Sequence, residues 1–374
     1  MKSSTQKRLG RGRIAAFLSI SLLVSACGSS SSKPSDSSAA PPSSAPDTTS
    51  VDTTSTTGEA TPVVTTAAGP VFPLTGIATS DAQAIARPAL VVKIDNHPLA
   101  RPQSGLNEAD IVFEENVEQL TRFAAVFQSG SSDPVGPIRS GRTQDVAMLA
   151  SLNRPLFAWS GGNARVTAAI SASDLRDLSA LTQKHKPAYF RSNAKSAPHN
   201  LYSKTASLFA FAPADAGPPP AQFTYRADGA ASAGDAVAGV NLSMDGVKVA
   251  WQWDAPTELF LRSSDGKPHR DAVDNAQLST NNVVVLYVDY KPSPADFKSP
   301  EAQTIGTGNA LVFSDGKVVK ATWSRTDRLQ PFALKDSAGS VVALTPGRTF
   351  VELGRADSAA PVPAGADMKS VRFP

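Results

Sequence analysis

The stretch Ala89-Leu90-Val91-Val92-Lys93-Ile94-Asp95-Asn96 decides the fold class of this 374-residue chain. Its first six residues are apolar except for Lys93, and a run of this length is typical of a buried strand. The polar pair Asp95-Asn96 ends the run. Pro98 and Pro102 keep the next residues out of a helix. The chain therefore contains a core strand with polar side chains at its end.

Further strands and one helical segment follow this core strand. Segments 110–114 and 123–128 have the character of strands, segment 151–159 contains a short strand, and segment 164–181 has helical spacing. This order predicts an α/β or α+β domain from residue 71 to residue 221.

A second pattern begins after a joint rich in proline, residues 213–220. In segment 247–253, Val and Trp alternate with more polar residues, which indicates a strand with one buried face. Asp-Gly pairs at 265–266 and 315–316 predict hairpin turns, segment 283–288 a core strand and segment 311–320 a hairpin. We predict a mostly β domain at 222–355 and a loosely held tail at 356–374.

The N-terminus has the features of an export signal. Residues 1–26 hold five basic residues and no acidic one, and the apolar run 14–26 is shorter than the roughly 20 residues that span a bilayer. Val24-Ser25-Ala26-Cys27 resembles the lipobox of bacterial lipoproteins. The resemblance implies a cleaved signal peptide, 1–26, and lipidation of Cys27, the only cysteine. The alternative is an ordinary cysteine after an ordinary signal.

Composition predicts a tether after Cys27 and a neutral body. Ser, Thr, Pro and Ala fill 32 of the 43 positions from 28 to 70, with no aromatic residue, so we predict that 27–70 is a disordered linker. Without the five basic residues of 1–26, the chain has 31 basic against 33 acidic residues. A near-neutral chain has no broad attraction for nucleic acid, and we expect none as a partner.

A series of short motifs runs through most of residues 88–353. Its members are Lys93–Pro98, Ala100–Leu106, Ala109–Glu114, Thr121-Arg122-Phe123, Gly136–Arg142, Tyr189–Arg191, Pro198–Asn200, Gly266–Asp271, Asn282–Val285, Trp323–Arg325 and Pro346–Phe350. In this order the series resembles the YerB-like bacterial lipoproteins, a family without an established reaction. The resemblance implies an N-terminal α/β-type domain, a β-rich C-terminal domain and a lipid anchor. The chain departs from the family at Gln119-Leu120, where small glycines are usual.

The segment Gly136-Pro137-Ile138-Arg139-Ser140-Gly141-Arg142 is a candidate anion site. Its glycines and proline turn the backbone tightly, and two guanidiniums three residues apart can converge on one carboxylate or phosphate. Ser140 adds a hydroxyl donor. The alternative is that both arginines form internal ion pairs with Glu114, Glu115 or Asp110.

Polar residues at strand ends form a second candidate cluster: Asp95, Asn96, His97, His199 and Asn200. They predict a cleft beside the arginines, with His97 or His199 as the acid–base partner of Glu114 or Asp95; His199 and Glu114 are the catalytic candidates. One alternative is a metal site, which needs three ligands among His97, His199, Asp95 and carboxylates such as Glu114. The other is that these side chains only tie loops to the backbone.

Weaker signals have structural alternatives. Ser160 lies in Ala158-Trp159-Ser160-Gly161-Gly162, which has the spacing of a nucleophile elbow but also of a helix entry with Asn163 as N-cap. Trp251 and Trp253 form either a sugar-stacking platform or part of a β core. His269 and Asp271 are interpreted as surface bracing. No phosphate-loop ending follows the glycines, so we expect no ATP, and we predict no cofactor and no metal.

Together the patterns favour a lipid-anchored envelope protein outside the cytoplasm that binds or scaffolds rather than catalyses. Its partners would be the membrane, through Cys27, and an anionic cell-wall polymer or an envelope protein. The alternatives are an envelope hydrolase or transferase acting on glycan or polyprenyl-linked phosphate, and a purely structural spacer. The predicted ligand-binding residues are Asn96, His97, Arg122, Arg139, Ser140, Arg142, His199 and Asn200.

Overall fold

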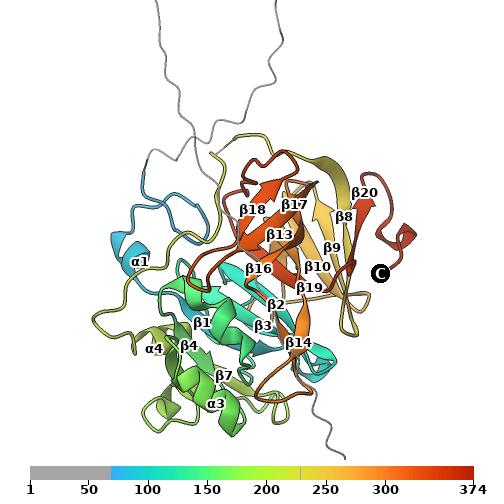
Figure 1. Cartoon of the computed structure of the whole chain (residues 1–374). Coiled ribbons are helices and arrows are strands. Elements are labelled where there is room, and N and C mark those ends of the chain that lie inside the picture. Colours follow the sequence, from blue (N-terminus) through green and yellow to red (C-terminus); the bar gives the residue numbers. More distant parts are fainter. Residues whose placement is uncertain (1–68, 228) are drawn as a thin grey trace, which may run out of the picture. The chain divides into compact units, whose positions relative to one another are not determined.

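A computed structural model describes residues 69–374 except residue 228, and all of them belong to one compact unit (Figure 1). The predicted signal peptide, Cys27 and the predicted tether up to residue 68 lie outside the described residues.

One mixed sheet of 16 strands dominates this unit, in the order β11-β10-β9-β8-β17-β16-β13-β19-β2-β3-β1-β4-β5, with β12, β18 and β20 added to β10, β17 and β8. The strands of its first part are β1 (Leu90–Asp95), β2 (Ile111–Val117), β3 (Leu120–Phe127), β4 (Leu156–Trp159) and β5 (Arg176–Ser179). Those of its second part are β8 (Asp235–Met244), β9 (Val247–Asp254), β10 (Leu259–Ser264), β11 (Lys267–Pro268), β12 (Ser279–Thr280), β13 (Asn282–Tyr287), β16 (Gly306–Ser314), β17 (Lys317–Arg325), β18 (Ala333–Asp336), β19 (Thr349–Gly354) and β20 (Ala359–Pro363).

Two small hairpins stand beside the main sheet. The first pairs β6 (Tyr189–Arg191) with β7 (Leu201–Ser203), and the second pairs β14 (Tyr290–Pro292) with β15 (Pro300–Ala302). Both border the cavity described below.

Strand β19 joins the two predicted domains. It runs parallel to β13 of the C-terminal part on one side and parallel to β2 of the N-terminal part on the other. The sheet is therefore continuous across both parts (Figure 1).

Strand β1 is buried on both faces, because the sheet separates two apolar clusters. Leu90, Val92 and Ile94 pack into one cluster and Val91 into the other. This position explains the continuous apolar run that marks the strand in the sequence. The strand pairs antiparallel with β3 and parallel with β4.

Helices are few and short in the described residues. They are α1 (Ala82–Ala86), α2 (Gln144–Met148), α3 (Ala164–Ser171) and α4 (Thr205–Phe209), with single 3-10 turns at Pro98–Ala100, Ala150–Leu152, Lys186–Ala188 and Met368–Ser370. The helical prediction for 164–181 is therefore wrong in its second half, which holds β5. Helix α3 ends at Ser171, and Val166 and Ile170 are its buried residues.

The described residues are mostly sheet, which places the fold nearer to α+β than to a layered α/β domain. The predicted strands at 89–94, 110–114, 123–128, 247–253 and 283–288 are confirmed. The predicted hairpin turns also lie between paired strands, β10–β11 and β16–β17.

Trp251 belongs to the core and is no sugar platform. Its side chain is fully buried and lies against Phe350, with ring centroids 4.7 Å apart. The segment 356–374 also differs from the expected loose tail. It contributes β20, and Asn241 of β8 donates to the carbonyl oxygens of Met368 and Val371, so the sheet holds this segment.

None of the helices among the described residues combines the length and the apolar character that crossing a bilayer requires.

Candidate functional site

The loop from Gly136 to Arg142 lies between β1 and β7. Its backbone is held on both sides: Arg139 N–H donates to the carbonyl of Lys93, at 2.9 Å, and Ile138 N–H donates to the carbonyl of Leu201, at 2.6 Å. Gly136 has a φ of +142°, and a Cβ there would stand 2.9 Å from the Leu201 carbonyl oxygen. Only glycine fits this turn, which aims the following arginines.

A cavity of about 720 Å³ opens beside this loop. Its walls come from the loop itself, the entry to α3, the β6–β7 hairpin and the β14–β15 hairpin. This volume lies within the range of about 300–1,000 Å³ that small-molecule sites occupy. Its charged or hydroxyl-bearing lining residues are Arg139, Ser140, Arg142, Ser160, Lys186, Tyr189, Arg191, Ser293, Asp296 and Ser299.

The lining contains four cations and one acid, Asp296. Two of the cations form ion pairs with carboxylates and two do not. Arg142 is bidentate to Glu118, with its Nη2 2.7 Å from each carboxylate oxygen. Arg139 makes a looser pair, its Nε 3.3 Å from Asp95 Oδ2. Lys186 and Arg191 have no carboxylate partner among the described residues. The cavity therefore presents a net positive charge.

Arg122 stands directly behind the two loop arginines. Burial, together with the charges of Arg142 and Arg139, lowers its pKa to about 10. Its Nη1 donates to the Ser140 carbonyl at 2.9 Å, which braces the loop from below. Hydrogen bonds from Arg142 and Ser299 outweigh partial burial and lower the pKa of Glu118 to about 2, so that carboxylate stays charged.

Asp95 connects the arginine loop with a pair of histidines. Its Oδ2 lies 2.7 Å from His199 Nδ1, and its Oδ1 accepts from His97 N–H at 3.0 Å. The two imidazole rings stack, with centroids 4.4 Å apart. A carboxylate accepts hydrogen bonds, so His199 carries its proton on Nδ1 when it is neutral.

Asn200 also lies at this edge and acts on a cation of the cavity. Its Oδ1 accepts from Arg191 Nη1 at 2.6 Å, and its Nδ2 donates to the Ser192 carbonyl. The structure thus brings together Arg122, Arg139, Ser140, Arg142, His97, His199 and Asn200 around one region.

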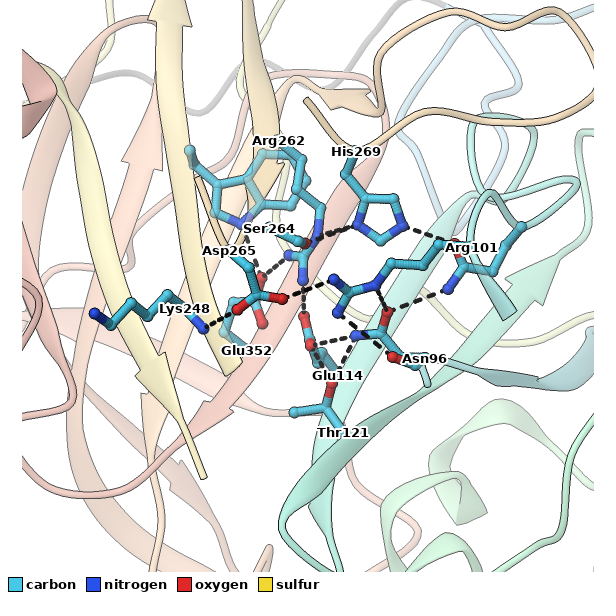
Figure 2. Close-up of polar contacts among 12 residues, drawn as sticks. Asn96, Arg101, Glu114, Thr121, Lys248, Arg262, Ser264, Asp265, His269 and Glu352 are labelled. Atoms are coloured by element: carbon cyan, nitrogen blue, oxygen red, sulfur yellow. Dashed lines mark hydrogen bonds and ion pairs between the residues drawn. The ribbon is translucent and has the colours of Figure 1, made fainter. Parts of the chain in front are cut away.

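Asn96 and Glu114 do not belong to this region, contrary to the sequence prediction. Both are fully buried in a separate network (Figure 2). Asn96 Nδ2 donates to Glu114 Oε1 and to Thr121 Oγ1, while Glu114 Oε2 accepts from Arg262 Nη2 at 2.6 Å. A carboxylate enclosed in this way does not reach a ligand, so Glu114 is excluded as an acid–base group.

Arg262 is the centre of this network, and sequence reasoning missed it. It donates to Glu114 on one side and to Glu352 Oε1 on the other, at 3.0 Å (Figure 2). The signal for it was present. Strand β10 alternates, and Arg262 occupies an inward position like Phe260 before it. Burial and the charge of Glu114 raise the pKa of Glu352.

His269 is buried beside Arg262 and is not on the surface as predicted. Burial and the charges of Arg262 and Arg101 lower its pKa well below the usual value, so the ring is neutral. Its Nδ1 lies 3.2 Å from Arg262 Nε and 2.9 Å from Ser264 Oγ, which makes Nδ1 the acceptor. Nε2 then donates to Gln103 Oε1 at 2.7 Å. Gln103 and His269 come from the two predicted domains, so this bond helps to join them.

A second buried ion group lies under the arginine loop. Lys93 Nζ donates to Glu115 and, at 2.9 Å, to Asp145, and all three side chains are fully buried. Asp145 Oδ2 also accepts from the backbone N–H of Arg142 at 2.7 Å. Burial and the charge of Asp145 raise the pKa of Glu115 to about 7, although Lys93 opposes the shift.

The titration of Glu115 predicts a measurable pH dependence of stability. The usual pKa of a Glu is about 4.3, so the folded protein takes up a proton between that value and about 7. The contribution of this group to the free energy of unfolding is full below the lower value and is lost as pH rises through the upper one. We expect the wild type to lose stability more steeply than Glu115→Gln from pH 5 to pH 7, by at most about 1.4 kcal/mol per pH unit. Urea unfolding at pH 5, 6, 7 and 8 measures this, and parallel curves would contradict it.

Ser160 lines the cavity, but no contact between it and a histidine is found in the described part of the chain. His185 packs against Phe211 instead, and Asp177 accepts from Trp159 Nε1. Asn163 Oδ1 accepts from Val166 N–H at 2.9 Å, which confirms the helix-entry interpretation. No group of three His, Cys, Asp or Glu side chains suited to a metal occurs within residues 69–374, residue 228 aside.

Comparison with known proteins identifies relatives of both parts. The family model for the N-terminal domain of DUF3048, a protein of unknown function, matches residues 74–217, and the model for its C-terminal domain matches residues 240–351. The Bacillus subtilis (strain 168) protein named "Putative lipoprotein YerB" is 28% identical over 302 residues, which are 75% of this chain and 85% of that protein. The first family model ends at residue 217, inside the proline-rich joint, and the second begins at residue 240.

A solved structure shares the fold. The crystal structure of the YerB protein from Bacillus subtilis matches with a TM-score of 0.68 at 24% identity, over 77% of this chain and 98% of that one. The resemblance that the sequence motifs indicated is thus confirmed.

Proposed function

We propose that this protein, which belongs to the DUF3048 family, is a lipid-anchored binding protein of the cell envelope whose basic cavity takes an anionic ligand. The lipoprotein name of the Bacillus subtilis relative and the lipobox ending at Cys27 support the anchor and the location outside the cytoplasm. The bound group is a carboxylate or phosphate of a wall polymer or of an envelope protein.

One observation carries the binding proposal: the cavity gathers four cations against the single acid Asp296. Arg139 is the central donor. Its side chain is 27% exposed and its Nε lies 3.3 Å from Asp95 Oδ2, while no hydrogen bond of its two terminal amino groups is found among the described residues. A planar guanidinium with N–H groups available in this way suits a carboxylate or phosphate.

Arg139→Ala is expected to weaken anion binding at least tenfold while the protein still folds. A hydrogen bond to a charged group contributes about 1.5–3 kcal/mol, which is roughly tenfold to a hundredfold in Kd. Calorimetric titration of residues 69–374 with pyrophosphate and with short poly(glycerol phosphate) measures the effect. Arg165→Ala is the matched control, because Arg165 is exposed on α3 and lies outside the cavity lining. Unchanged affinity in Arg139→Ala would remove the proposal, and unfolding of that variant would instead assign Arg139 to an internal ion pair.

The Asp95–His199 pair favours a second candidate, a hydrolase or transferase acting on the bound ligand. With its proton on Nδ1 held by Asp95, His199 offers Nε2 as a general base, the arrangement in which a carboxylate orients a catalytic imidazole. This candidate predicts turnover of the ligand that disappears in His199→Asn. A ligand that stays intact after long incubation with the wild type supports binding alone.

A further inference from the structure

Large apolar side chains lie exposed at the same cavity that holds the cations. Leu181 is 69% exposed and Phe190 is 43% exposed, and both line it. Phe297, 76% exposed, lies on the β14–β15 loop next to the lining residue Asp296. Large apolar side chains gathered at one site on a soluble surface mark a place where something apolar binds.

Other apolar surface lines the same cavity. It comes from Ile138, Val166, Ala180, Pro198 and Leu201 and from the ring of Tyr189. Leu181 lies over the glycine turn before α3, where a Cβ on Gly161 would stand 2.5 Å from its Cδ1. Phe190 stacks on Tyr202, with ring centroids 6.1 Å apart. Leu181 and Phe190 therefore give the cavity an apolar surface next to its guanidiniums.

We propose that the ligand is an anionic amphiphile: a phosphate or carboxylate head that binds the cations, joined to an apolar chain that covers Leu181 and Phe190. This inference rests on the proposed anion binding and adds the chemical class of the ligand. A purely polar polyanion leaves the two apolar side chains in water. A neutral apolar molecule leaves Lys186 and Arg191 without a counter-charge. Only a molecule with both parts satisfies the whole lining.

The inference is tested by measuring the affinity of residues 69–374 for four soluble probes: inorganic phosphate, octyl phosphate, octanoate and octyl glucoside. The three probes with an alkyl chain are used below their critical micelle concentrations. We expect octyl phosphate to bind at least tenfold more tightly than inorganic phosphate, because each buried methylene contributes roughly threefold to fourfold in affinity. Octyl glucoside, which has the chain without the charge, should bind at least tenfold more weakly than octyl phosphate. The ratio of the affinities for octanoate and for octyl phosphate shows whether the site prefers a carboxylate or a phosphate head.

Variants separate the contribution of the chain from that of the head. Leu181→Ser with Phe190→Ser should reduce the advantage of octyl phosphate over inorganic phosphate to less than threefold. Arg139→Ala should weaken the binding of inorganic phosphate and of octyl phosphate alike. Leu329→Ser is the matched control, since Leu329 is 51% exposed and lies outside this cavity. It should leave the affinities for inorganic phosphate and for octyl phosphate unchanged.

The outcomes distinguish this inference from the proposal on which it rests. If inorganic phosphate binds and the octyl chain adds nothing, the amphiphile is ruled out while anion binding stands. If no anion binds, both fail. Vesicles of phosphatidylglycerol and of phosphatidylcholine provide a final arm. Binding to anionic vesicles without binding to octyl phosphate would overturn the inference in favour of attachment to a bilayer surface.

Discussion

Arg262→Ala is expected to lower the free energy of unfolding by about 3–5 kcal/mol, the usual cost of removing one partner from a buried ion pair. Arg262 has no exposed surface and donates to Glu114 and Glu352, which are equally buried. Without the guanidinium, Glu114 keeps a charge in the interior that no cation balances. The three aromatic rings around the guanidinium, those of Phe123, Trp251 and Phe350, cannot replace it.

Urea unfolding measures this loss against a matched control. Arg328→Ala likewise removes an arginine from an ion pair, here with both carboxylate oxygens of Asp174. The side chain of Arg328 is 40% exposed, so we expect the free energy of unfolding to fall by at most about 1 kcal/mol. If Arg262→Ala is too unstable to purify, Arg262→Met combined with Glu114→Gln and Glu352→Gln decides the question. Replacing all the charges together should recover part of the stability. Equal losses for Arg262→Ala and Arg328→Ala would show that the network contributes little.

Lys93→Met is expected to cost a similar amount, about 3–5 kcal/mol, for the same physical reason. The methionine keeps an unbranched apolar side chain, one atom shorter than that of lysine, but leaves Glu115 and Asp145 without the ammonium group that they share. Because Asp145 also accepts the backbone N–H of Arg142, we expect the variant to loosen the arginine loop and to weaken anion binding as well.

Lys204→Met is the control for this substitution, because Lys204 pairs with Asp133 on the surface, where both side chains are more than half exposed. It should change stability by less than about 1 kcal/mol. The triple variant Lys93→Met, Glu115→Gln, Asp145→Asn tests whether charge is the cause. A triple variant as unstable as the single one would point to lost packing instead.

The two buried ion groups have different roles in the molecule. The Arg262 network connects side chains from the two family domains and lies where β19 pairs with β2. The Lys93 group supports the loop that carries Arg139 and Arg142. Arg262 variants are therefore expected to lose stability without losing affinity for the ligand. Lys93 variants are expected to lose both.

Sequence alone determined the elements whose signals are local. The apolar run at 89–94 predicted β1 because a strand covered on both faces has no polar side to alternate with. The Asp-Gly pairs predicted two hairpins because their backbone conformation is intrinsic to those residues. The spacing of Arg139 and Arg142 predicted a basic site, and both line the cavity.

Only the tertiary structure decided which charged residue meets which. Sequence reasoning offered Glu114, Glu115 or Asp110 to the loop arginines, but these arginines pair with Asp95 and Glu118. Glu114 and Glu115 face opposite sides of β2, so one meets Arg262, 148 residues away, and the other meets Lys93. Ion pairs between strands depend on the register and the order of the strands in the sheet. Register and strand order are set by the apolar burial of the whole chain, so no local stretch of sequence determines them.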